Sequence, residues 1–515
     1  MMPVASSTPG AAGPAATGRG RLGAAYARLL TGGVLGKALG FVREIALAAS
    51  FGTGPAAASF RAAQTATLVP THIFSADALN AGFIPLCAQY LREDPRRAGS
   101  LYTAVSLLMA AIAFAVAGLL WVGAEAWAGL LVPGFSPEQR AMTAAMLRAM
   151  AIGVPFYVQA ALASYVEMAH GRYLVGSIRS AVQNVGLLVG IGAAVLTGNP
   201  LLLAWGFTAY AIGFAAVGVW STGRAGMLAW PRPGSWPEAG RQLGELVRIA
   251  RPLLLLPLVQ QAALAAERVV ASLIGLEAVA ATDYARALAD TGLALIAVPL
   301  GLAGLAELGR LDRDAARDRL RSLLRLLLVV TVPASVFLAL HAEPVVRLVF
   351  ARGEFGDSSV RITTLVLTGL AVGFWAQVTG YVMVRGLAIE RRNGRVALVS
   401  AVAAATHIGV NLALFRAIGP LALGIAASAG AIALLALAVY ALGMSRDMVR
   451  FAIPVAGGTL IYVPLGLALR GDGALALLAS GTAALGFWAA FALLVLRQRP
   501  AAAALARAPA YERAR

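Results

Sequence analysis

Ionisable side chains inside apolar stretches are the residues of this sequence best suited to chemistry. Seven stand out, four basic and three acidic: Lys37, Arg43, Arg61, Arg286, Glu44, Asp283 and Asp290. A charge within a bilayer costs roughly 2.5–3.5 kcal/mol on insertion scales, so such groups face a bundle interior or a wet cavity. A pyrophosphate would bind strongly there, because the dielectric is low and arginine offers two parallel donors. The pattern predicts an anion-binding cavity with the basic residues as ligands and the acidic ones in support.

The spacing of these residues also allows plainer interpretations. Lys37 and Arg43 are separated by about 120° around a helix, so both can border one wide cavity, but they could also snorkel or pair with Glu44. Asp283 and Arg286 are i,i+3 neighbours and Arg286 and Asp290 are i,i+4 neighbours, so a self-neutralising ladder on the helix surface is an alternative.

The composition places the elements that carry these residues in lipid. Of 515 residues, 59% are hydrophobic and only 13% are charged, with a mean hydropathy of +0.78. Soluble domains carry about a quarter charged residues. The net charge of +18 is typical of basic loops that set membrane topology, and nucleic-acid binding is not expected. The single cysteine, Cys87, excludes an internal disulfide and a multi-cysteine metal site.

The apolar runs predict an all-α polytopic membrane protein, because spanning segments without strand-like alternation must be helices. About fourteen transmembrane helices are expected: 24–50, 56–90, 100–122, 141–168, 174–197, 200–222, 246–274, 280–305, 322–341, 360–386, 395–416, 419–443, 451–469 and 474–496. Every second loop is rich in arginine, whereas those between, such as Gly52–Pro55, are short, neutral or mixed. Basic loops mark the cytoplasmic side, so both termini are predicted to be cytoplasmic.

An internal repeat divides the chain. Ser180-Ala181-Val182 recurs as Ser400-Ala401-Val402, Gly153 as Gly373 and Pro200 as Pro420, each 220 residues later. We therefore predict two parallel six-helix lobes whose charged front helices line a central cleft. The expected organisation is a disordered tail (1–21), an N-lobe (22–223), a cytoplasmic linker (224–245), a C-lobe (246–443), two further helices (444–497) and a cytoplasmic tail (498–515).

Four stretches carry a family resemblance: the segment from Gly36 to Glu44 (GKALGFVRE), the following Ala49–Gly54 (ASFGTG), Ile73–Pro85 (IFSADALNAGFIP), and Tyr284–Leu288 (YARAL). Together they resemble the MurJ/MviN lipid II flippases of the multidrug/oligosaccharidyl-lipid/polysaccharide exporter superfamily. The resemblance implies alternating access by a fourteen-helix carrier that moves an undecaprenyl-pyrophosphate-linked glycan across the bacterial inner membrane. It places Lys37, Arg43 and Arg286 at cavity-cation positions and implies no cofactor, with sodium or the membrane potential as the driving force.

Departures from the family pattern keep other functions open. Ala58, Thr71 and Ala285 stand where the family has charged residues, so a flippase for an exopolysaccharide or O-antigen unit fits as well. A drug or cation antiporter of the same superfamily fits less well, because the first helix is net basic. No catalytic residues are expected, since none of the four histidines has a carboxylate at the spacing of a catalytic motif and no P-loop is present. The partners expected are the lipid-linked glycan and the bilayer, with the protein a monomer.

Overall fold

A computed structural model describes residues 35–75, 77–224, 226, 236–250, 255–308, 313–390, 392–471 and 473–497. Within these ranges every regular element is a helix, as predicted. The predicted tails 1–21 and 498–515, and much of the predicted linker 224–245, lie outside the described residues.

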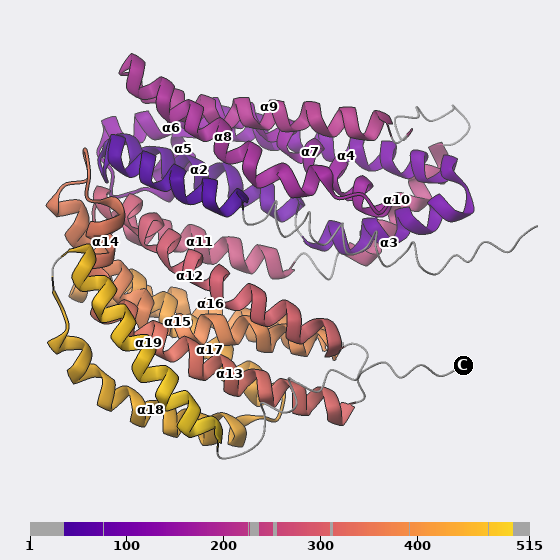
Figure 1. Cartoon of the computed structure of the whole chain (residues 1–515). Helices are drawn as coiled ribbons and strands as arrows, with labels where there is room; N and C mark the ends of the chain where they lie inside the picture. Colours follow the sequence, from indigo (N-terminus) through magenta and orange to yellow (C-terminus); the bar gives the residue numbers. More distant parts are fainter. Residues whose placement is uncertain are drawn as a thin grey trace, which may run out of the picture.

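The N-lobe occupies the upper half of Figure 1. It consists of a helix over residues 35–51, α2 (Pro55–Ser75), α3 (Asp77–Glu93), α4 (Pro95–Val122), α5 (Ala124–Leu131), α6 (Pro137–Ala151), α7 (Val154–Ala169), α8 (Leu174–Thr197) and α9 (Leu201–Arg224). The amphipathic α10 (Trp236–Ala250) follows it along the chain and packs against α3 and α4.

The C-lobe forms the lower half of Figure 1. Its helices are α11 (Leu255–Ile274), α12 (Leu276–Leu308), α13 (Arg313–Leu340), α14 (Ala342–Phe350), α15 (Asp357–Ile389), α16 (Asn393–Ile418) and α17 (Leu421–Ala441). The last two helices, α18 (Ser445–Ala468) and α19 (Ala474–Arg497), pack on the outside of α13 through their own apolar cluster, which includes Val329, Tyr462 and Trp488.

The 220-residue repeat is visible in the packing of the two lobes. The Thr208 hydroxyl of α9 donates to the Ala149 carbonyl of α6 at 2.6 Å, and the Ser428 hydroxyl of α17 donates to the Gly369 carbonyl of α15 at the same distance. Ser428 lies 220 residues after Thr208, and Gly369 lies 220 residues after Ala149. The helix pairs therefore pack in the same way, although α6 and α7 are bent by 45° where α15 is one continuous helix.

The described residues contain nine helices long and apolar enough to span a membrane, or ten if α6 and α7 form one span. The predicted count of fourteen is therefore not confirmed. The four remaining predicted spans coincide with helix 35–51, with α2 and α3, with α11 and with α12, which carry the intramembrane charges. In detail, the predicted span 56–90 is divided between two helices, and 246–274 begins within α10.

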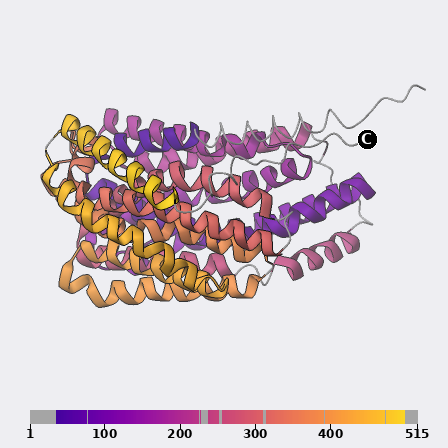
Figure 2. The same cartoon turned by 60° about the horizontal axis from the view of Figure 1, so that its bottom comes forward.

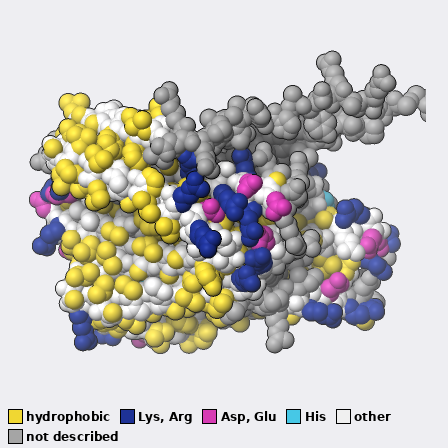
Figure 3. Space-filling model, turned by 90° about the horizontal axis from the view of Figure 1, so that it is seen from below, with side chains coloured by type: hydrophobic (Ala, Val, Ile, Leu, Met, Phe, Trp, Pro, Cys, Tyr) yellow, Lys and Arg dark blue, Asp and Glu magenta, His cyan; other side chains and the backbone are white. Residues whose placement is uncertain are grey.

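The outer surface suits a lipid environment. Figure 2 shows the long helices of both lobes running in one general direction. In the view of Figure 3, hydrophobic side chains cover much of the surface, and many Lys and Arg side chains gather towards the end where α13 and α18 begin. Arg317, Arg446 and Arg450 are exposed in that region. The chain is thus a multi-span membrane protein with a basic rim.

Candidate anion-binding cavity between the lobes

A cavity of about 530 Å³ lies between the lobes. Its walls are formed by helix 35–51, α2 and α8 from the N-lobe and by α11 and α12 from the C-lobe. All seven predicted residues line it, so side chains about 250 positions apart meet in one space: Lys37, Arg43, Glu44, Arg61, Asp283, Arg286 and Asp290. Their role as substrate ligands stays a prediction.

The N-lobe wall is organised around the buried carboxylate of Glu44. One of its oxygens pairs with Arg43 and the other with Arg61. Arg43 also donates from Nη1 to Oδ1 of Asn184 on α8 at 2.9 Å, and Asn184 in turn donates to the Gly36 carbonyl at 2.8 Å. The ion pair between Arg43 and Glu44, one of the alternatives considered from the sequence, is therefore present. Asn184 also holds the Arg43 guanidinium at the cavity wall. No pattern in the sequence predicted a role for Asn184.

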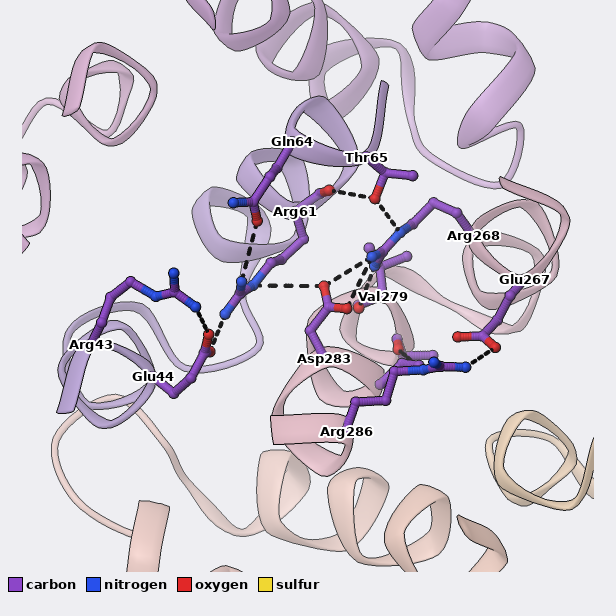
Figure 4. A network of polar contacts seen from close by, with 12 residues as sticks. Arg43, Glu44, Arg61, Gln64, Thr65, Glu267, Arg268, Val279, Asp283 and Arg286 are labelled. Atoms are coloured by element: carbon purple, nitrogen blue, oxygen red, sulfur yellow. Dashed lines mark hydrogen bonds and ion pairs between the residues drawn. The ribbon is translucent and has the colours of Figure 1, made fainter. Parts of the chain in front are cut away.

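Asp283 joins the two lobes through two arginines (Figure 4). Its Oδ2 lies 3.6 Å from Nε of Arg61 in the N-lobe and 2.9 Å from Nη2 of Arg268 in the C-lobe. Arg268 also donates from Nε to the Thr65 hydroxyl of the N-lobe at 3.1 Å. The Arg61 guanidinium lies 5.7 Å from the centre of the Tyr284 ring, within cation–π range. These residues form an inter-lobe bridge.

The interpretation of residues 283–290 as a helix-surface ladder is wrong. Arg286 pairs with Glu267 of α11, and Asp283 pairs with Arg61 and Arg268 instead. Nε2 of His407 on α16 lies 2.8 Å from the same Glu267 oxygen that Arg286 contacts. The spacing along one helix could not reveal these partners, because they come from neighbouring helices.

The cations of the cavity differ in how accessible they are. The side chains of Arg61 and Arg268 are only 5–6% exposed and are held in the bridge. Lys37 is exposed to the cavity and has no ion-pair partner among the described residues, while the Arg286 side chain is 32% exposed. Five basic and three acidic side chains line the cavity, an excess of two positive charges. The arrangement can attract an anion and offer it Lys37, Arg43 and Arg286.

The two lobes meet on the left in Figure 1, and we call this contact the closed end of the cavity. Tyr284 donates from its hydroxyl to the Gly52 carbonyl at 2.9 Å, and the Glu354 amide donates to the Ala49 carbonyl at 2.9 Å. At Gly353 the backbone has φ of +57°, and an added Cβ would lie 2.2 Å from the Ala49 carbonyl oxygen. Behind this contact the buried rings of Tyr284, Phe350 and Phe355 pack with centroids 5.3–5.5 Å apart. The lobes therefore touch backbone to backbone, sealed by an aromatic cluster.

The sequence comparisons agree on one family, and the solved structures share the fold. The family model described as "Lipid II flippase MurJ" matches residues 47–469. A probable lipid II flippase MurJ of Rhizobium meliloti is 27% identical to this chain, and the match covers 75% of this chain and 74% of the relative. A probable lipid II flippase MurJ of Synechocystis is 26% identical, and the match covers 68% of each chain. A solved structure of lipid II flippase MurJ in an inward closed conformation matches with a TM-score of 0.80 at 15% identity, covering 91% of this chain and 99% of its own. An inward-facing multidrug resistance MATE transporter matches at 0.65 and 12% identity, covering 81% and 95%.

Proposed function

Because the chain belongs to the lipid II flippase MurJ family, we propose that it moves lipid II, an undecaprenyl-pyrophosphate-linked cell-wall precursor, across the bacterial inner membrane. The observation that carries the proposal is the cavity itself: Lys37 and Arg43 from one lobe and Arg286 from the other line a single space with an excess of positive charge. Such a space suits the pyrophosphate group, whose negatively charged oxygens can accept charge-assisted hydrogen bonds from arginine and lysine.

The closed end of the cavity supports alternating access. The contacts of Gly52, Gly353 and Glu354 join the lobes at the end whose loop 52–55 lacks basic residues. Basic loops mark the cytoplasmic side, so the closed end would face outward and both termini inward. A monomer in this state would take its substrate from the cytoplasmic leaflet. Release on the other side would require the contacts at the closed end to separate, driven by sodium or the membrane potential.

The alternative substrates are less well supported. A drug or cation antiporter needs an acidic cavity, whereas this one is net basic. A flippase for an exopolysaccharide or O-antigen unit would use the same pyrophosphate chemistry, but the family match favours lipid II.

The decisive experiment is transport by the purified protein. We expect proteoliposomes that contain it to move fluorescent lipid II to the opposite leaflet, where an impermeant quencher cannot reach it. A polyprenyl pyrophosphate carrying an unrelated glycan serves as the competing substrate. Depletion in cells should leave lipid II on the inner leaflet. Faster movement of the unrelated glycan, or its accumulation instead of lipid II, would contradict the proposal.

A further inference from the structure

Besides its charged residues, the cavity is lined by neutral polar side chains from two helices of the N-lobe. On α2 these are Gln64 and His72, with Leu68 between them, and on α8 they are Ser180 and Gln183. The three α2 residues follow each other at intervals of four, so they share one face of the helix along about 12 Å. Ser180 and Gln183 are three residues apart and share a face of α8. We call the four polar residues the neutral patch.

Most hydrogen-bonding groups of the neutral patch are unused in the described part of the chain. The half-buried amide of Gln183 makes no hydrogen bond there, and the His72 ring only contacts the Tyr157 ring, with centroids 6.4 Å apart. Gln64 accepts from Nη1 of Arg61 at 3.3 Å through Oε1, which leaves its amide nitrogen unused. Unpaired polar groups between membrane-spanning helices are costly. Water or a ligand in the cavity therefore supplies the missing hydrogen bonds.

The neutral patch lies directly beside the proposed anion site. Gln183 precedes Asn184, whose Oδ1 accepts from Nη1 of Arg43 at 2.9 Å. Gln64 contacts Arg61, which shares a carboxylate with Arg43. Both glutamines are thus one residue removed from the guanidinium that faces the pyrophosphate. A chemical group attached to a bound pyrophosphate would come next to them.

The C-lobe has no equivalent of this patch. Gln183 corresponds in the 220-residue repeat to Ala403 of α16, which has no hydrogen-bonding side chain. The uncharged C-lobe residues that line the cavity are Leu264, Ala287 and Thr291, and the Thr291 hydroxyl already donates to the Ala287 carbonyl at 2.7 Å. The same helix position thus folds with an alanine in one lobe. This favours a role for the Gln183 amide in binding over a role in packing.

The chemistry of the patch matches a sugar. A glutamine amide both donates and accepts hydrogen bonds, as a sugar hydroxyl does. Phe41 and Leu68 line the same cavity and add apolar surface for the C–H face of a ring, a combination typical of small-molecule sites. The two glutamines carry no charge, so they suit a neutral part of the substrate.

We propose that the neutral patch is a subsite for the sugar attached to the pyrophosphate, with Gln64 and Gln183 as its main hydrogen-bonding residues. The inference rests on the proposed function, because it assigns the part of the cavity that recognises the glycan of the transported lipid. The cations of the cavity then bind any polyprenyl pyrophosphate, whereas the patch selects those that carry a sugar.

The test compares two lipids that differ only in the sugar. One is a short-chain polyprenyl pyrophosphate, and the other is the same lipid with one N-acetylated hexosamine on the pyrophosphate. Their affinities for the purified full-length protein are measured by calorimetry in detergent. We expect the sugar-bearing lipid to bind about tenfold more tightly than the bare lipid, and Gln183→Leu to reduce this ratio about fivefold. The bare lipid has no group for Gln183 to contact, so its affinity shows whether the variant is folded.

Two further variants make the result decisive. Gln64→Leu should reduce the ratio about threefold, because only its amide nitrogen is unused. Gln89→Leu, on the exposed face of α3, is the matched control and should keep the wild-type ratio. An unchanged ratio in both Gln183→Leu and Gln64→Leu, or equal affinity of the wild-type protein for the two lipids, would mean that the patch holds water only and would overturn the subsite.

Failure of the proposed function gives different results. If neither lipid bound the wild-type protein, the proposed anion site would be wrong and the subsite with it. If the preference for the sugar were present and sensitive to Gln183→Leu, but lipid II were not transported in proteoliposomes, the result would contradict the proposed function alone.

Discussion

The two lobes place opposite dipeptides on their first helices. Helix 35–51 of the N-lobe carries Arg43-Glu44, whereas α11 of the C-lobe carries Glu267-Arg268. In the N-lobe the arginine of the pair is held by a neutral amide, Asn184 of α8. In the C-lobe the glutamate of the pair contacts His407 of α16, the counterpart of α8 in the repeat.

The difference gives the two walls of the cavity different charges. The N-lobe wall has three cations and one anion (Lys37, Arg43, Arg61 and Glu44), whereas the C-lobe wall, with Glu267 included, has two cations and three anions (Arg268, Arg286, Glu267, Asp283 and Asp290). The N-lobe wall therefore has an excess of two positive charges, whereas the C-lobe wall has an excess of one negative charge. The two halves of this duplicated fold thus differ in how strongly they attract an anion.

The largest expected effect is on the rate of transport, which should fall more when the N-lobe wall is changed than when the C-lobe wall is changed. Arg43→Ala should reduce lipid II translocation on the order of a hundredfold, because one arginine can make two charge-assisted bonds to a pyrophosphate. Arg286→Ala should reduce it only about tenfold, since Glu267 already offsets its charge. The measurement is translocation in proteoliposomes at matched protein content. Arg148→Ala, an exposed residue paired with Glu125 away from the cavity, is the control and should transport normally. Normal transport by Arg43→Ala would remove the site assignment.

The second expected effect is on the free energy of unfolding, which should fall by different amounts when each of the two buried glutamates is replaced. Glu44→Gln leaves the guanidinium groups of Arg43 and Arg61 without their shared carboxylate, and we expect it to lower the free energy of unfolding by about 3–5 kcal/mol. Glu267→Gln should cost less, because the Arg286 side chain is 32% exposed and can be solvated from the cavity. Thermal unfolding of the two variants in detergent measures both losses. A larger loss in Glu267→Gln than in Glu44→Gln would contradict this order.

Sequence reasoning found the charged residues of the cavity but not their partners. Lys37, Arg43 and Arg286 stood out because charges inside apolar runs are rare. Asn184 and His407 did not, since a neutral amide and a lone histidine in a helix carry no such signal. The repeat was visible because small residues at close helix contacts, such as Gly373, tolerate little change. The predicted number of spans is not confirmed, because the helices that carry the charges fall below the hydropathy of ordinary spans. The same charges made the site visible in the sequence.

A smaller effect is expected at the closed end of the cavity. Gly353→Ala should destabilise the contact between the lobes by about 1–3 kcal/mol, because the positive φ and the Ala49 carbonyl leave no room for a methyl group. A cysteine introduced at Thr53 in a Cys87→Ala background should then react faster with an impermeant maleimide. Gly171→Ala also has a positive φ, of +69°, but an added Cβ would meet no atom within 4 Å, so it should not change the labelling rate. Equal labelling rates in both variants would argue against this contact as a gate.

The smallest effect compares the two repeated hydrogen bonds. Thr208→Val removes one bond to the Ala149 carbonyl and should cost about 1 kcal/mol. Ser428→Ala should cost about twice as much, because the Ser428 hydroxyl also accepts from the Gly373 amide at 2.8 Å. Thermal unfolding of the two variants tests this order, and a larger loss in Thr208→Val would contradict it.

The backbone contact at the closed end has an electrical consequence. Where Ala49 and Gly353 meet, with Tyr284, Phe350 and Phe355 behind them, there is little space for a file of water. A bare ion in such an apolar layer would lose tens of kcal/mol of hydration. A carrier with a wide, charged entrance can therefore sit in an energised membrane without short-circuiting its voltage.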